Sequence, residues 1–358
     1  MKHPIILFYF IILQVNCFSQ EVDTTDYPFF RRRIATLTLM IELNPEDAAI
    51  LLERSFFRQQ IQDFKGGISD LDSYLKIYMY DYKAVATRAV LKTYLSDYDG
   101  AIADCDKAIS MKPEFIDPYH TRAMAHKGNG NYPAALKDLE KTIEMEPTYL
   151  EAIYEKAITE YDMGEFNASI LSLSQIIKID TTNSQMYENC LLARGFAKNQ
   201  LLDYKGAIVD YNKVLMINPT NAKAINNRGS SNYGLGFYKE AILDFNKAIV
   251  IDPLYAKAYL KRGDTKLKLA DYEGGLTDMN TSISLDPTDP IAFYQRGIAK
   301  YLLKDYQGSI EDLSHSIQLD PTFFQTFYQR GLTYEAMGEL EKAKVDFKMA
   351  EIMEHGGK

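Results

Sequence analysis

The chain has 358 residues, with 40 basic and 49 acidic side chains, and its formal net charge is −9 at pH 7. Nucleic-acid binding calls for a basic surface, so this acidic chain argues against a nucleic-acid partner. A net charge of this size otherwise bears mainly on solubility.

The first nineteen residues have the composition of a secretory signal peptide. Lys2 precedes a ten-residue apolar run, Pro4–Leu13, which is too short to span a bilayer. We expect cleavage after the small residue Ser19. Lipidation at Cys17 is the alternative, but Val15-Asn16 is a poor lead-in for it. The mature chain is therefore expected to be exported, either periplasmic or secreted, and no later segment is apolar enough for stable membrane insertion.

Residues 20–47 connect this segment to the repeats and contain one amphipathic helix, Arg31–Leu43, which ends at Asn44-Pro45. Its pattern matches the second helix of a repeat whose first helix would fall in the targeting segment. We expect it to cap the N-terminal end of the fold.

From residue 48 onward, one pattern of about 34 residues recurs nine times. Each copy has a small residue at its eighth and twentieth places, and all but the last have an aromatic residue at the seventeenth. Six copies close with a proline that cannot continue a helix. A fixed period of this length indicates a stacked-repeat architecture. The nine repeats span 48–81, 82–115, 116–149, 150–187, 188–221, 222–255, 256–289, 290–323 and 324–354.

Each repeat holds two apolar stretches at helical spacing, split by a short turn, and the small residues allow the two helices to approach closely. This pattern resembles the tetratricopeptide repeat (TPR) family over most of the chain. The usual Trp at the fourth place is replaced by residues such as Tyr119, Ile153, Tyr259 and Phe293. The resemblance implies an all-α fold, a right-handed α-solenoid of antiparallel helix pairs, here called helix A and helix B of each repeat.

The fourth repeat departs from the pattern. Thr181 stands where Pro is expected, and Ser184–Tyr187 adds four residues, about one helical turn. We expect a longer helix A in the fifth repeat, and a bend or weak point between repeats 1–4 (48–187) and repeats 5–9 (188–354). At the other end, the helix Glu341–Glu354 should act as a cap before the tail 355–358, with Lys344, Lys348 and Glu351 outward.

The seventh place is basic in every repeat, and the twenty-third is Asp in eight of them, Ser172 being the exception. Because these places lie on facing helices, we expect a ladder of Arg–Asp pairs, within or between repeats. Exposed pairs contribute only about 0–1 kcal/mol each, so we expect the ladder mainly to fix register. The basic residues are Arg54, Arg88, Arg122, Lys156, Arg194, Arg228, Arg262, Arg296 and Arg330.

No pattern in the chain has catalytic or ligand spacing. His120 and His126 lie six apart, which does not suit a zinc site on a helix. The Gly-rich stretch Gly128–Asn131 lacks the Lys-Ser/Thr of a phosphate loop. Cys105 and Cys190 lie three repeats apart, too far to form a disulfide in a solenoid. We therefore expect no catalytic residue, metal, cofactor or small-molecule substrate.

In TPR proteins the concave face is formed mainly by helix A, at the second, fifth, ninth, twelfth and thirteenth places. Nine of these positions are aromatic here: Phe56, Tyr94, Tyr154, Tyr161, Phe196, Tyr233, Tyr294, Tyr301 and Tyr328. Aromatic anchors among polar groups suit protein or peptide recognition. Some of them could instead pack between adjacent helices. The candidate partner-binding residues are Tyr94, His120, Tyr154, Tyr161, Asn226, Tyr233, Lys257, Tyr294, Tyr301 and Tyr328.

Some TPR cochaperones clamp a terminal carboxylate with Lys, Asn and Arg at the fifth and ninth places, but here no Lys or Arg occupies these places. The sequence therefore predicts a non-enzymatic scaffold of the cell envelope that binds a peptide segment or protein partner on its concave face. One alternative is a structural component that self-assembles through its terminal repeats. A remote alternative is an enzyme with an unrecognised site.

Overall fold

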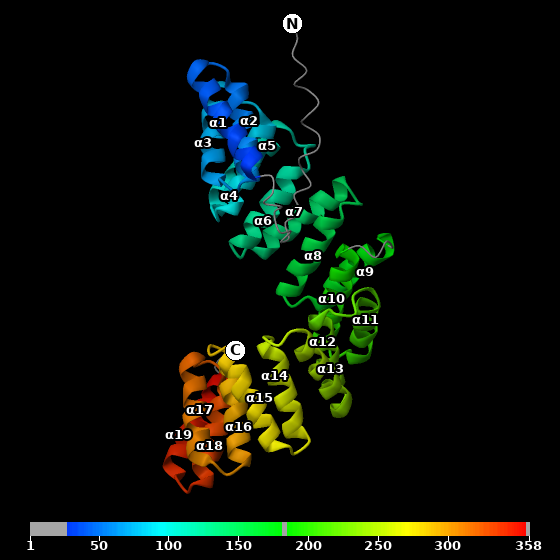
Figure 1. The fold of residues 1–358 in the computed structure, drawn as a ribbon, viewed down its shortest axis with the longest axis vertical. Helices are drawn as coiled ribbons and strands as arrows, with labels where there is room; N and C mark the ends of the chain where they lie inside the picture. The colour runs from blue at the N-terminus through cyan, green and yellow to red at the C-terminus, as the bar shows by residue number, and fades with distance from the viewer. Residues whose placement is uncertain (1–26, 181–184, 356–358) are drawn as a thin grey trace. The chain divides into compact units, whose positions relative to one another are not determined.

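The computed structural model describes residues 27–180 and 185–355, which form nineteen helices and no strand within those ranges (Figure 1). The predicted signal peptide and the Thr181–Ser184 part of the predicted weak point lie outside the described residues. Within the two ranges, no helix combines the length and apolar character needed to cross a bilayer.

The helices follow the predicted repeats, with a single helix before the first pair. Contacts divide the chain into two compact parts, residues 1–152 and 153–358, and each part is described by itself. The helices are α1 (Tyr27–Leu43), α2 (Ala48–Gln60), α3 (Phe64–Ile77), α4 (Tyr82–Tyr94), α5 (Tyr98–Met111), α6 (Asp117–Gly128), α7 (Tyr132–Met145), α8 (Leu150–Asp162), α9 (Phe166–Ile179), α10 (Gln185–Gln200), α11 (Tyr204–Ile217), α12 (Ala222–Gly234), α13 (Tyr238–Ile251), α14 (Ala256–Lys268), α15 (Tyr272–Leu285), α16 (Pro290–Leu302), α17 (Tyr306–Leu319), α18 (Phe324–Ala336) and α19 (Leu340–His355).

The predicted antiparallel pairs are confirmed: α2–α3, α4–α5 and each later pair form helix A and helix B of one repeat. Helix B then packs on helix A of the next repeat, as α11 does on α12 and α13 on α14. The longer helix A of the fifth repeat is also confirmed, since α10 has 16 residues and α12 and α14 have 13.

The turn between the two helices depends on one residue with a positive φ, in the left-handed region, at the fifteenth place of every repeat. It is glycine in four repeats, as at Gly130 (φ +72°), and another residue in five, as at Ser96 (φ +60°). Where Asp precedes helix B, its carboxylate caps the helix by accepting from the amide of the residue three positions on, as Asp97 does from Gly100. A Cβ at Gly100 would lie 2.2 Å from that carboxylate. Asp at the sixteenth place therefore requires Gly at the nineteenth, and the two occur together in five repeats.

The core inside each repeat depends on complementary sizes at the eighth and twenty-fourth places. Gly195 faces the buried Tyr211, and a Cβ there would lie 2.5 Å from the ring. Gly331 faces Phe347 in the same way, at 2.7 Å. In the second repeat, by contrast, the buried Cys105 is small and the facing place holds an alanine. Large side chains are accommodated by removing the opposing Cβ, as close packing requires.

The predicted Arg–Asp ladder is confirmed, and all eight pairs lie within a repeat. In each pair Nε and Nη2 of Arg donate to the two carboxylate oxygens, at 2.7–3.0 Å and 2.5–2.8 Å. The expectation of exposed pairs was wrong, because the Asp side chains are at most 9% exposed and the Arg side chains at most 25%. Breaking a buried pair leaves an uncompensated charge and costs more than breaking an exposed one.

Each ladder Arg also reaches the preceding helix B through Nη1. Arg228 donates to Asn212 at 2.7 Å, and Arg296 donates to Asn280 at 2.9 Å, both at the twenty-fifth place of the repeat before. In the first repeat, Arg54 donates to Thr38 of α1 at 3.0 Å, and Thr38 lies 34 residues before Asp72 of the next repeat. The helix α1 therefore occupies the place of a lone helix B, as predicted, although it begins four residues earlier than expected.

The C-terminal helix α19 differs from the preceding second helices at the twenty-fifth place of its repeat. Lys344, Lys348 and Glu351 are exposed on it, as predicted for a cap. Lys348 occupies the twenty-fifth place, where the preceding helices have Asp, Glu, Asn, Ser or Thr. A lysine ammonium cannot accept a hydrogen bond from another Arg. The twenty-fifth place, which accepts from the following Arg in other repeats, therefore has no acceptor side chain on α19.

The fourth repeat keeps the charge arrangement but moves its carboxylate from helix B to helix A. Glu160 of α8 is 5% exposed and accepts from Lys156 and from Ser172, each at 2.8 Å. In most other repeats the eleventh place, occupied here by Glu160, is basic, and the twenty-third is Asp. This exchange was not predicted from the sequence, where Ser172 was noted only as the exception to Asp at the twenty-third place.

We expect the exchange of Arg296 and Asp312 to reveal the strength of one pair. Arg296→Asp alone should lower the free energy of unfolding by about 3 kcal/mol, because it leaves two buried carboxylates side by side. Adding Asp312→Arg should restore only part of this loss, since Lys300 also contacts Asp312 at 2.8 Å. Urea unfolding of the four species measures the coupling. Glu311→Lys, at an exposed neighbour, is the control and should change stability by less than about 0.5 kcal/mol. Additive effects would contradict the pairing.

A second exchange tests the arrangement in the fourth repeat. Glu160→Lys should destabilise the repeat by removing the carboxylate that Lys156 and Ser172 contact, and Ser172→Asp should destabilise it by adding a carboxylate beside Glu160. The double variant recreates the charge pattern of the other repeats, so its urea midpoint should exceed that of both single variants. A double variant less stable than either single one would show that Glu160 is not equivalent to the missing Asp.

Candidate partner-binding surface

The first helices of successive repeats also contact one another. In the C-terminal part these contacts join α10 to α12, α12 to α14, α14 to α16 and α16 to α18, and in the N-terminal part they join α4 to α6. Helix A therefore forms the inner row in each part, and its second, fifth, ninth, twelfth and thirteenth places are the ones that a partner on this side would meet.

A groove of about 230 Å³ lies between α8 and α10. Five of its six lining residues occupy the predicted places, and the sixth is Ala193. The hydroxyl of Tyr161 accepts from Gln200 at 3.1 Å and links the same two helices. The edge of the Phe196 ring packs on Tyr211 behind it, with centroids 6.3 Å apart. The lining residues are Tyr154, Ile158, Asn189, Leu192, Ala193 and Phe196.

The walls of this groove are mainly apolar, and burial raises the pKa of Tyr154 to about 12. A neutral phenol beside Ile158 and Leu192 suits an apolar side chain with one polar contact, the composition usual for a binding pocket. Tyr154 and Phe196 were recognised from the sequence. Asn189 and Leu192 were not singled out, although their second and fifth places were the available signal.

The predicted concave-face residues Tyr233 of α12 and Tyr294 of α16 both lie near the carboxylate of Asp264 on α14. Burial, followed by the charge of Asp264, raises the pKa of Tyr233. Burial and then the same carboxylate raise the pKa of Tyr294. Tyr233, Asp264 and Tyr294 occupy the twelfth, ninth and fifth places of consecutive repeats. One carboxylate on the inner row is thus close enough to act on two phenols.

In the N-terminal part, the two candidates pack against neighbouring rings. Tyr94 stacks on Phe64 with centroids 4.8 Å apart and is 41% exposed. The ring of His120 lies 5.3 Å from that of Tyr149 and is half-buried. Tyr94 therefore keeps a face available to a partner, whereas His120 contributes mainly to packing.

The remaining candidates in the C-terminal part differ in exposure. Tyr328 is 53% exposed beside Phe347, and Lys257 is also exposed. Tyr301 is half-buried, 5.7 Å from the Tyr306 ring. Asn226 is 5% exposed, and its amide donates to Asn227 at 3.4 Å, so it offers little surface to a partner.

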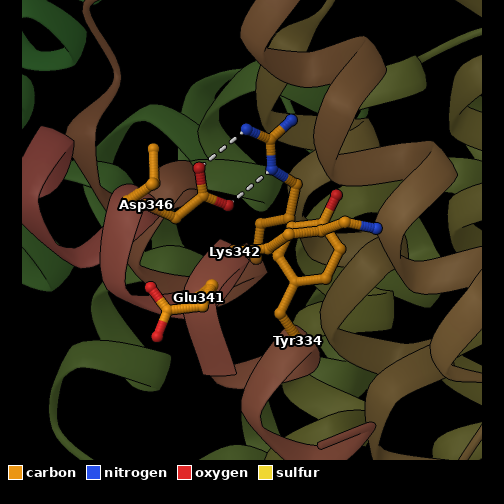
Figure 2. A pocket seen from close by; sticks show the side chains of 6 residues that line it. Tyr334, Glu341, Lys342 and Asp346 are labelled. Carbon is orange, nitrogen blue, oxygen red and sulfur yellow. Dashed lines mark hydrogen bonds and ion pairs between the residues drawn. The ribbon is translucent and has the colours of Figure 1, made fainter. Parts of the chain in front are cut away.

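A second cavity, of about 370 Å³, lies in the last repeat on the side of the Arg–Asp ladder (Figure 2). Tyr334 replaces the basic residue that most other repeats have at the eleventh place, and Lys342 lies over its ring at 5.3 Å. Arg330 and Asp346 form the ladder pair at its edge. This cavity lies away from the predicted concave-face places, and two of its charged groups, Arg330 and Asp346, are paired with each other.

The two cysteines in the described residues lie in the core of their repeats, away from these surfaces. Cys105 and Cys190 are buried and form no disulfide, and burial raises the pKa of both thiols, that of Cys190 to about 12. Neutral, buried thiols behave as small hydrophobic residues. Among residues 27–180 and 185–355, no group of three or more His, Cys, Asp or Glu side chains is placed to hold a metal ion.

A family model described as tetratricopeptide repeat matches residues 256–289 and 324–350, which are the seventh repeat and most of the ninth. A comparison with curated proteins finds no match. Two solved structures share the fold. A tetratricopeptide repeat protein from Parabacteroides merdae is 17% identical, with 72% of this chain and 97% of that chain covered and a TM-score of 0.54. The Cut9–Hcn1 hetero-tetramer of the APC/C is 14% identical, with 86% and 60% covered and a TM-score of 0.55.

A crystal structure of MamA is also similar, at 26% identity, with 46% of this chain and 95% of that chain covered and a TM-score of 0.41. The helix pairs, their period and the family-model match agree with one another. The chain is therefore a multi-repeat member of the tetratricopeptide-repeat family, whose repeats generally serve as protein–protein interaction scaffolds.

Proposed function

We propose that this protein is a non-enzymatic scaffold that holds a peptide segment or protein partner on its inner row of helices, after export to the cell envelope. The groove between α8 and α10 is the observation that carries the proposal. Export rests on the N-terminal sequence alone, where Lys2 and the apolar run Pro4–Leu13 precede Ser19.

The groove suits an apolar anchor side chain of the partner. Phe196 is 36% exposed and stands at one wall, while Tyr154, Ile158 and Leu192 are half-buried. Desolvated aromatic and aliphatic pockets of this kind commonly contribute most of the binding energy at an interface. Asn189 at the edge can donate to or accept from a backbone amide of the bound segment.

The Tyr233–Asp264–Tyr294 cluster adds a preference for a basic residue in the partner. The charge of Asp264 acts on both Tyr233 and Tyr294, on the same row of helices as the groove. A lysine or arginine side chain would meet both a charge partner and ring faces there. The proposed partner therefore presents an apolar anchor and a basic side chain.

The groove can be tested with variants that copy residues from other repeats. Phe196→Ser reproduces Ser230, which holds the same ninth place in the sixth repeat. We expect at least about a tenfold loss of affinity for a partner captured from envelope extract, since truncating a central anchor costs about 2 kcal/mol or more. Fluorescence anisotropy measures the affinity, and circular dichroism checks that the variant folds.

The triple variant Tyr294→Ala, Tyr301→Ala and Tyr328→Ala tests the C-terminal end of the inner row in the same assay. Folded variants that all bind normally would refute binding on the inner row.

The Asp264 cluster predicts a defined change in tyrosine titration. Asp264→Asn should lower the pKa of both Tyr233 and Tyr294, because a negative charge that opposes phenolate formation is removed. The pKa of Tyr154 should stay near 12, since its causes are burial, Cys190 and Glu155. Nuclear magnetic resonance of ring-labelled tyrosine between about pH 9 and 14 follows the three groups. Unchanged values for Tyr233 and Tyr294 would contradict the geometry of the cluster.

A further inference from the structure

The second helices of two successive repeats, α11 and α13, carry an unusual outer surface, which we call the Lys–apolar stripe. On each helix a lysine and an apolar side chain alternate at the eighteenth, twenty-second, twenty-sixth and twenty-ninth places of the repeat. All eight side chains are exposed, and the apolar ones strongly so: Val209 is 54% exposed, Leu243 69%, Val250 79% and Met216 82%. The stripe consists of Lys205, Val209, Lys213 and Met216 on α11 and Lys239, Leu243, Lys247 and Val250 on α13.

The repeat itself does not require apolar residues at these places. The seventh repeat has Thr277 and Ser284 where α11 has Val209 and Met216, and the eighth has Glu311 and Gln318. Helix B folds equally in all these repeats. The apolar side chains of α11 and α13 therefore add nothing to folding that a polar residue does not supply elsewhere.

The stripe faces away from the inner row. Spacings of four, four and three residues bring all four side chains of a helix to one side. The opposite sides of α11 and α13 are occupied by α12, which packs on both. Leu171 of α9, at the same place as Val209 and Leu243, is 72% exposed, and Leu254 after α13 is 75% exposed. An exposed apolar surface of this extent is uncommon unless a partner covers it.

The charges of the stripe restrict what can cover it. In the described part of the chain, Lys205, Lys213, Lys239 and Lys247 form no ion pair, although the whole chain carries a net charge of −9. A second copy paired through the same surface would bring lysines against lysines. A membrane-surface helix separates its basic and apolar residues onto different faces, whereas here they alternate along one line. A complementary partner must alternate acidic and apolar groups.

We propose that the Lys–apolar stripe of α11 and α13 is a docking site for an acidic amphipathic helix of a partner protein. Leu, Ile or Val side chains of that helix lie against Val209, Met216, Leu243 and Val250, and its Glu or Asp side chains pair with the four lysines. The site is independent of the groove between α8 and α10 and lies on the other side of the repeats. The scaffold would thus bind two partners at once, one on each side.

The test uses a synthetic helical peptide of about 18 residues, five turns, with Leu and Glu alternating on one stripe. Fluorescence anisotropy with the full chain should give saturable binding that weakens as salt is raised. The apolar variant, Val209→Thr, Met216→Ser, Leu243→Thr and Val250→Ser, copies the seventh repeat and should fold. It should weaken binding by about tenfold or more, as loss of a desolvated contact does. The charge variant, Lys205→Glu, Lys213→Gln, Lys239→Glu and Lys247→Gln, should do the same and reduce the salt dependence.

Matched controls separate this site from the others. Gln307→Ala and Gln318→Ala, at the same places of α17, should leave peptide binding unchanged, and so should the groove variant Phe196→Ser. The proposal is overturned if the Leu/Glu peptide fails to bind, if the same peptide with Lys in place of Glu binds equally well, or if Phe196→Ser alone abolishes binding. Cosedimentation with phosphatidylglycerol vesicles that the charge variant abolishes would assign the stripe to a lipid surface. A dimer in light scattering that the apolar variant abolishes would assign it to a second copy.

Discussion

The fold depends on one partly buried arginine in eight of the nine repeats, which binds three helices together. Arg296 lies on helix A of its repeat, donates twice to Asp312 on helix B, and reaches Asn280 on the helix B before it. One side chain thus fixes both the pairing within a repeat and the register between repeats. Arginine suits this role because its five donors have a fixed planar geometry. The nearly buried carboxylate makes the arrangement strict, since an unpaired charge there is costly.

These contacts and the packing of small residues hold successive repeats together. The residues exposed on the inner row, and those exposed on the opposite side of each repeat, are therefore free to vary. On the inner row, this freedom produces the groove of Tyr154 and Phe196 and the cluster around Asp264. On the opposite side, it produces the Lys–apolar stripe, while the seventh and eighth repeats stay polar at the same places. Repeats of one fold can therefore carry different binding surfaces, which is how a solenoid acquires specificity.

Departures from the pattern occur as matched pairs of residues. Gly195 faces the large Tyr211 at places where the second repeat has an alanine facing Cys105. In the fourth repeat, Glu160 supplies the carboxylate that Ser172 lacks. In each case a change at one place accompanies a change at the place that faces it. The fourth repeat thus keeps a carboxylate at this position, although on the other helix.

The sequence by itself determined the repeat period, the helix pairs, the longer α10 and the Arg–Asp pairs, because all of these follow from residue types at fixed spacings along a periodic chain. The resemblance to the tetratricopeptide repeat also pointed to Tyr154 and Phe196 as inner-row residues, by the places that they occupy. Only the tertiary structure decided that the ladder is buried, that Arg228 reaches Asn212 of the preceding repeat, and that Glu160 replaces a missing Asp. It also decided which inner-row side chains meet in a groove and which, like Asn226, are buried. Such contacts depend on how side chains of different volume fill the space between helices, and a spacing pattern contains no information on that fit.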